Sequence, residues 1–189
     1  MNTNTIRIIG GRWRGRLIHF PDVEGLRPSG DRIRETVFNW LQNEMDGAVC
    51  LDLFAGTGVF GFEALSRGAE SAVFIDENTI VTEALRNTVQ KLSATNVDII
   101  AQRIPLVALD QKYFHKKFNI VFIDPPFKKD LIRVACEWLE SAELLAENAL
   151  IYIESERELL TLPIPESWDI LKSKNAGQVS YYLIRANIC

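Results

Sequence analysis

Almost wholly apolar segments alternate with segments of helical periodicity through most of this chain. Strands that are apolar on both faces need helices over both faces, which is typical of a parallel sheet joined by helical crossovers. The sequence therefore predicts a doubly covered α/β sheet. The predicted strands are 48–53, 71–75, 97–101, 118–123 and 149–154, and the predicted helices between them are 59–67, 78–92 and 129–140.

The two ends of the chain have a different pattern. Segments 169–174 and 179–184 flank a short turn and predict a hairpin, so the last strand should run antiparallel. Near the start, residues 6–20 predict a small β-hairpin around Gly10-Gly11, and a helix is expected to be capped by Asp31 and to reach Met45. We expect residues 1–30 to form a hairpin arm on a single compact domain, 31–189.

Composition limits the class of protein. The 189 residues are 47% apolar, enough for one domain with a substantial core, and no apolar run approaches the length of a membrane span. Residues 1–5 contain no apolar signal region, which predicts a cytoplasmic protein. Cys50, Cys136 and Cys189 lie far apart without a Cys-x-x-Cys motif, so we expect neither a disulfide framework nor a metal site.

Positive charge is concentrated at the N-terminal end. The net charge is −4, but residues 1–34 carry seven arginines against three acidic residues, a net +4, which leaves −8 on the rest. Arginines interleaved with a tryptophan are typical of a nucleic-acid contact, although a solvated strand would show the same charge. The candidate contacts are Arg7, Arg12, Trp13, Arg14, Arg16, Arg27 and Arg34.

The run Asp124-Pro125-Pro126-Phe127 directly follows the apolar segment 118–123. Each proline fixes its own φ, lacks an N–H group and restricts the residue before it, so the run predicts a stiff corner at the carboxyl end of a strand. Open α/β sheets bind their ligands at that edge. A fixed carboxylate, prolyl carbonyls and a flat ring suit a planar base with an exocyclic amine. The structural alternative is a strand-end turn with a core phenylalanine.

A glycine-rich segment follows the first long apolar strand. Gly56, Gly58 and Gly61 match the dinucleotide fingerprint, with Asp76 twenty residues after Gly56. Nicotinamide and S-adenosylmethionine enzymes both need such glycines and an acid for the ribose. Asp52 favours S-adenosylmethionine, because its carboxylate would attract an ammonium group and repel a pyrophosphate. The candidate cofactor contacts are Asp52, Phe54, Ala55, Gly56, Thr57, Gly58, Asp76, Glu77, Gln102 and Arg103.

Further motifs are spread along nearly the whole chain. They occupy residues 10–15 (Gly-Gly-Arg-Trp-Arg-Gly), 27–29, 31–36, 52–58, 63–69, 124–127, 152–156 and 176–179. Together they resemble the RsmD-type methyltransferases. The resemblance implies a class I S-adenosylmethionine-dependent fold, Rossmann-like, with a mostly parallel seven-stranded sheet, an antiparallel last strand and a small N-terminal hairpin.

The resemblance also implies an activity. Enzymes of this family transfer a methyl group from S-adenosylmethionine to the 2-amino group of a specific guanine in 16S ribosomal RNA of the small subunit. It would place Asp124 and the Pro125 carbonyl on that amino group, with Phe127 stacked on the base. Whether Asp124 also takes the proton stays open. The expected protein is a monomer with no membrane or metal partner.

The chain departs from the family pattern in three places. Asp76 replaces the usual glutamate, Ser29 replaces a commoner threonine, and no carboxylate follows the third strand, which leaves Gln102 or a backbone carbonyl for the adenine. Arg27 could meet the cofactor carboxylate or an RNA phosphate. The alternatives are a methyltransferase acting on amino groups of DNA or another RNA, a nicotinamide oxidoreductase and a non-catalytic RNA-binding protein.

Overall fold

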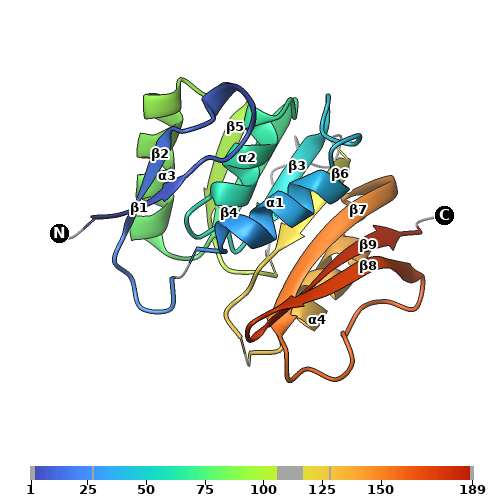
Figure 1. The fold of residues 1–189 in the computed structure, drawn as a ribbon. Coiled ribbons are helices and arrows are strands. Elements are labelled where there is room, and N and C mark those ends of the chain that lie inside the picture. The colour runs from blue at the N-terminus through green and yellow to red at the C-terminus, as the bar shows by residue number, and fades with distance from the viewer. Residues whose placement is uncertain (1–2, 27, 106–116, 128, 188–189) are drawn as a thin grey trace. The chain divides into compact units, whose positions relative to one another are not determined.

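The structure, a computed structural model, describes residues 3–26, 28–105, 117–127 and 129–187 (Figure 1). The fold is a seven-stranded, mostly parallel sheet with an antiparallel last strand and a separate N-terminal hairpin, which confirms the predicted class. The chain divides into two units, Met1–Arg103 and Ile104–Cys189. The strands and helices predicted between 48 and 154 are confirmed to within four residues at each end.

Three parallel strands, in the order β5-β4-β3, form the sheet of the first unit. Phe74 and Ile75 on β4 and Leu53 on β3 are fully buried, as expected for strands covered on both faces. The elements of this unit are β1 (Thr3–Arg7), the 3-10 helix η1 (Gly11–Trp13), β2 (Leu17–Pro21), α1 (Asp31–Trp40), β3 (Val49–Leu53), α2 (Val59–Ser66), β4 (Ser71–Asp76), α3 (Thr79–Leu92) and β5 (Val97–Ala101).

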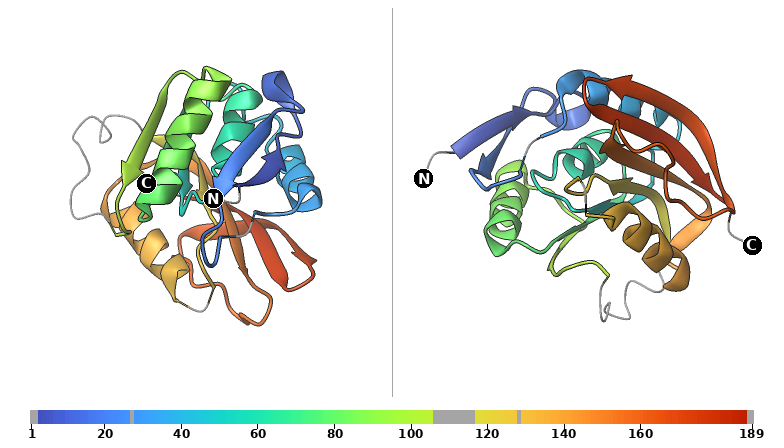
Figure 2. Two further views of the ribbon diagram at one scale, coloured as in Figure 1. Left: turned by 90° about the vertical axis from the view of Figure 1, so that its left-hand side faces the viewer. Right: turned by 90° about the horizontal axis from the view of Figure 1, so that it is seen from below.

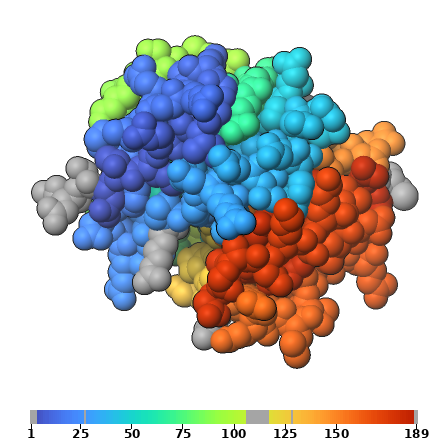
Figure 3. All heavy atoms as spheres, in the orientation of Figure 1, coloured from blue at the N-terminus to red at the C-terminus, as the bar shows by residue number. Residues whose placement is uncertain are grey.

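The N-terminal hairpin is docked on the first unit. Strands β1 and β2 pair antiparallel, with Ile6 opposite Ile18, and both side chains are buried together with Phe20. Strand β2 contacts α3, and η1 contacts α2 (Figure 2). In the space-filling view the dark-blue hairpin residues adjoin the lighter-blue and green residues of the same unit (Figure 3). The predicted arm is therefore present, and its apolar face belongs to the core of the first unit.

Helix α1 differs from the sequence prediction at both ends. Gly30 is its N-cap, and Asp31 is its first helical residue, whose carboxylate pairs with Arg34 and does not cap the helix. The helix ends at Trp40, well before Met45. A turn closed by the hydrogen bond from Glu44 N to the Leu41 carbonyl follows, and it lets Met45 reach the core without continuing the helix.

The second unit contains four strands in the order β6-β7-β9-β8. Strands β6 and β7 are parallel, with Ile123 opposite Ile153, whereas β7–β9 and β9–β8 are antiparallel. None of the helices in the described part of the chain combines the length and hydropathy that a membrane crossing requires. The elements of this unit are β6 (Phe118–Ile123), α4 (Leu131–Ser141), β7 (Leu145–Glu156), β8 (Trp168–Ala176) and β9 (Val179–Ala186).

Candidate active site

The glycine-rich loop connects β3 to α2 through three residues with positive φ. Phe54, Gly56 and Gly58 have φ values of 58°, 53° and 71°. A Cβ atom on Gly58 would lie 2.4 Å from the Leu85 side chain, so this turn has no room for a larger residue. The loop is therefore a tight turn in which Gly58 is packed against the side chains of Leu85 and Phe62.

Asp76 ties the end of β4 to this loop. Its Oδ2 accepts a hydrogen bond of 2.9 Å from Gly56 N, and its Oδ1 accepts one of 2.8 Å from Asn78 N. The side chain is half-buried, and this burial raises the pKa of its carboxyl despite the two backbone donors. Each carboxylate oxygen keeps a further acceptor position, which suits the two hydroxyls of a ribose.

Asp52 lies inside β3 and is only 3% exposed. Its Oδ2 accepts a hydrogen bond of 3.0 Å from Gly61 N in α2. The pKa of Asp52 is raised to about 8, mainly by burial, with the Gly61 donor opposing the rise and the nearby charge of Asp76 adding to it. Among the ion pairs of the described residues, none involves Asp52. A contact of Asp52 with the ammonium group of a cofactor stays a prediction.

The remaining cofactor candidates lie around the same loop or just beyond β5. Thr57 is buried, and its Oγ1 accepts from Val59 N at 3.3 Å, at the start of α2. Gln102 is exposed and follows Ala101, which pairs with Asp76 across the sheet. Glu77 and Arg103 are exposed and 3.8 Å apart. Their roles, and those of Phe54 and Ala55, stay predictions.

The Asp-Pro-Pro-Phe run follows the last residue of β6, as predicted. Pro125 is buried, Asp124 is half-buried, and Pro126 is exposed. Phe127 is 38% exposed, so it is not the core phenylalanine of an ordinary strand-end turn. The corner presents an acid and a ring at the carboxyl end of a buried strand.

A second acidic group lies near this corner. Tyr152 Oη donates a hydrogen bond of 2.7 Å to Glu154 Oε1, and both side chains are buried on β7. Burial raises the pKa of Tyr152 most, and the charges of Glu154 and Asp124 add to it. Sequence reasoning assigned this pair no role. The sequence does contain a sign of this pair, because Tyr152 and Glu154 are two residues apart on an apolar strand and therefore lie on one face of it.

The arginine candidates divide into exposed and buried groups. Arg7, Arg12, Arg14 and Arg16 are exposed on the hairpin and stay candidates for RNA contact. Trp13 is only 8% exposed, and the Arg12 guanidinium lies 4.2 Å from the centre of its ring. Trp13 therefore supports Arg12 and does not offer a free stacking face.

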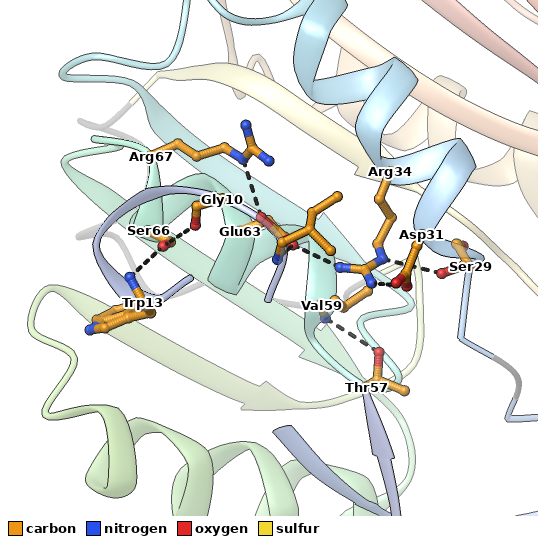
Figure 4. A network of polar contacts seen from close by, with 11 residues as sticks. Gly10, Trp13, Ser29, Asp31, Arg34, Thr57, Val59, Glu63, Ser66 and Arg67 are labelled. Atoms are coloured by element: carbon orange, nitrogen blue, oxygen red, sulfur yellow. Dashed lines mark hydrogen bonds and ion pairs between the residues drawn. The ribbon is translucent and has the colours of Figure 1, made fainter. Parts of the chain in front are cut away.

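Arg34 does not fit an RNA contact. Its side chain is fully buried, and its Nη1 donates to Glu63 Oε1 at 2.7 Å (Figure 4). The expectation of an exposed guanidinium is wrong, because the helix turns this arginine toward an acidic partner on α2. Arg27 lies outside the described residues.

Comparison with known proteins identifies the family. Residues 6–185 match the family described as Conserved hypothetical protein 95. Ribosomal RNA small subunit methyltransferase D of Escherichia coli K12 is 44% identical over 178 residues, which cover 94% of this chain and 88% of that protein. The protein of the same name from Haemophilus influenzae is 43% identical over 180 residues, covering 94% and 92%. The chain belongs to the RsmD-type methyltransferase family.

A solved structure supports membership in the RsmD family. The yhhF protein of Escherichia coli is 39% identical to this chain, with a TM-score of 0.86 over 98% of this chain and 100% of that one. The likeness therefore extends over the hairpin, the glycine loop and the Asp-Pro-Pro-Phe corner together. It confirms the resemblance that these motifs indicated.

Proposed function

We propose that this chain transfers a methyl group from S-adenosylmethionine to the exocyclic 2-amino group of a guanine in 16S ribosomal RNA of the small subunit. The observation that carries the proposal is the Asp-Pro-Pro-Phe corner with its exposed Phe127, on a chain 44% identical to a ribosomal RNA small subunit methyltransferase. Bound S-adenosylmethionine supplies a reactive sulfonium methyl group.

The first unit offers groups that suit this cofactor. In this proposal the backbone of the loop 54–58 contacts the methionine part, and Asp52 provides a carboxylate for its ammonium group. Asp76, already fixed by two backbone N–H groups, accepts from the ribose hydroxyls. Gln102 and Arg103 directly follow β5, the strand that pairs with β4, where Asp76 lies. We assign both residues to the adenine of the cofactor.

The second unit offers groups that suit an aromatic amine. The lone pair of such an amine is delocalised into the ring, so the nitrogen is a weak nucleophile and must be held in line for attack. Asp124 accepts one amino hydrogen and the Pro125 carbonyl accepts the other. Asp124 also stabilises the positive charge that the nitrogen acquires during transfer. Phe127 stacks on a base that has left its helix or loop.

The hairpin supplies the RNA contact in this proposal. Its exposed arginines lie on one loop and one strand pair, where they can bind phosphates without reading the base sequence. The choice of the target base then depends on the shape of the RNA and on the bases that the small ribosomal subunit exposes. The proposed RNA contacts are Arg7, Arg12, Arg14 and Arg16.

The decisive experiment compares wild type with Asp124→Ala and Asp124→Asn. Small-subunit particles from cells lacking this gene serve as substrate, with duplex DNA as a second substrate, and mass mapping locates the methyl group. We expect transfer to one guanine N2 in the particle, and a loss of roughly 100-fold or more in Asp124→Ala. Binding of S-adenosylhomocysteine should not change, which controls for folding. Intact transfer in Asp124→Ala, or methylation of DNA alone, would contradict the proposal.

A further inference from the structure

Glu63 is a buried carboxylate in the middle of α2, outside the groups assigned to either substrate. Its Oε1 accepts from Ile9 N at 2.6 Å and from Arg34 Nη1 at 2.7 Å, and its Oε2 accepts from Arg67 Nε at 3.1 Å (Figure 4). These donors come from the hairpin, from α1 and from α2 itself. One side chain thus joins three segments that are distant in sequence.

Ser66 extends the contact with the hairpin. Its Oγ donates to the Gly10 carbonyl at 2.6 Å and accepts from Trp13 N at 2.9 Å. Ser66 lies three residues after Glu63, so both side chains point to the same face of α2. Together they hold the backbone of residues 9–13 at three points, and this loop carries Arg12.

Two glycines permit this close docking. A Cβ atom on Gly10 would lie 2.3 Å from the Arg67 guanidinium, and one on Gly11 would lie 1.9 Å from the Ser66 carbonyl oxygen. Gly11 also has a φ of +72°. The loop therefore rests directly on α2, with no space between the two backbones for a side chain.

Arg34 carries the same network toward the cofactor loop. Besides Glu63, its guanidinium binds the Ser29 carbonyl at 3.3 Å and pairs with Asp31. Nearby, the Leu26 side chain lies against Gly56, because a Cβ atom on that glycine would be 2.8 Å from Leu26 Cδ1. Before α1, Arg34 thus fixes Ser29, and Leu26 touches the cofactor loop.

We propose that Glu63 is a positioning residue for both substrates of the reaction. Through Ile9 it fixes the loop of residues 9–13, which carries Arg12, in the position proposed for RNA binding. Through Arg34 it holds Ser29 and the nearby Leu26 against the cofactor loop. This inference rests on the proposed function. Groups that are already ordered lose little conformational freedom when a ligand binds, so binding costs less free energy. Glu63 therefore acts on the affinity for both ligands and little on the chemical step.

The test must separate positioning from folding. Removing Glu63 alone leaves Arg34 buried without its partner, which would damage the fold. The double variant Arg34→Met/Glu63→Met removes both charges and keeps comparable volume in the core. Ser66→Ala removes contacts to the hairpin alone. Glu137→Met on α4, an exposed partner of Arg133, is the matched control.

In the double variant we expect the KM for the rRNA particle to rise about tenfold and the Kd of S-adenosylhomocysteine to rise about fivefold, in line with the ordering of one or two segments. The kcat at saturation should stay within about twofold. Ser66→Ala should raise only the KM for the particle. Glu137→Met should change neither constant.

A folded double variant with both constants unchanged would overturn the proposal, and a change in only one of them would overturn the role toward the other ligand. Amide hydrogen exchange at residues 9–13 and the Kd of S-adenosylhomocysteine need no methyl transfer. These two measurements therefore test the positioning role of Glu63 even if the wild type methylated no rRNA. Absence of rRNA methylation would contradict the proposed function alone.

Discussion

Two buried carboxylates of the first unit, Asp52 at the end of β3 and Glu63 in α2, have opposite surroundings. Glu63 accepts from two arginines and a backbone N–H group. Asp52 accepts from one backbone N–H group, and burial raises its pKa to about 8. A carboxylate whose partners are all in the protein stabilises the fold. A buried carboxyl group with a raised pKa is instead typical of functional sites, which is why Asp52 and not Glu63 is the candidate for ligand binding.

The largest effect that this comparison predicts is on stability. Glu63→Leu should lower the free energy of unfolding by about 3–5 kcal/mol, because Arg34 loses its buried counter-charge and keeps only the exposed Asp31. Urea unfolding followed by circular dichroism measures it. Glu137→Leu, whose carboxylate is exposed, should change stability by less than about 1 kcal/mol. If the two variants changed the free energy of unfolding equally, the contacts of Glu63 would not be what stabilises the packing of α1 and the hairpin on α2.

The next effect is on cofactor affinity. Asp52→Asn should weaken S-adenosylhomocysteine binding at pH 8 by about 1.5–3 kcal/mol, roughly ten- to hundredfold, because a charged hydrogen-bond acceptor becomes a neutral one. Calorimetric titration measures the Kd. The variant should remain as stable as wild type or become more stable at that pH. Unchanged affinity would mean that the ammonium group binds elsewhere.

A smaller effect concerns pH. The folded, ligand-free protein keeps a proton on Asp52 that the unfolded chain releases from about pH 4, since the pKa is raised from 3.8 to about 8. The free energy of unfolding should therefore fall as pH rises through this window, by at most about 1.4 kcal/mol per pH unit from this group. Asp52→Asn should flatten the slope.

Denaturant midpoints at half-unit pH steps would measure the slope in wild type and Asp52→Asn. The slope should not vanish in the variant, because the pKa of Asp76 is raised as well and acts in the same direction. Identical slopes in both proteins would show that Asp52 does not keep a proton in the folded state over this pH range.

The sequence predicts the fold and the place of the corner after β6 well, because both depend on local patterns. Apolar runs and turn residues determine strands and helices, and the prolines at 125 and 126 determine the corner wherever the rest of the chain goes. The positive φ angles of Phe54, Gly56 and Gly58 agree with the tight turn that the glycines predict after the first long strand.

The roles of charged and aromatic side chains were harder to predict. Arg34 has the same charge as Arg32, which is exposed, and each is flanked by Ile33 and an acidic residue, but the buried partner of Arg34 lies 29 residues away. Trp13 is buried because η1 packs on α2. The end of α1 also escaped prediction, since Leu41 and Met45 are buried through a turn and keep the periodicity of a helix without forming one.

The close contact of Gly10 and Gly11 with α2 limits how the hairpin can be exchanged between related proteins, in evolution or by design. Since a side chain on either glycine would collide with Arg67 or the Ser66 backbone, a hairpin without these two glycines would not fit on this α2. Such a hairpin, borrowed from a relative with a different target, would have to arrive together with its own second helix. The unit that recombination or a designer can exchange is this pair, and the two segments should therefore diverge in step among related enzymes.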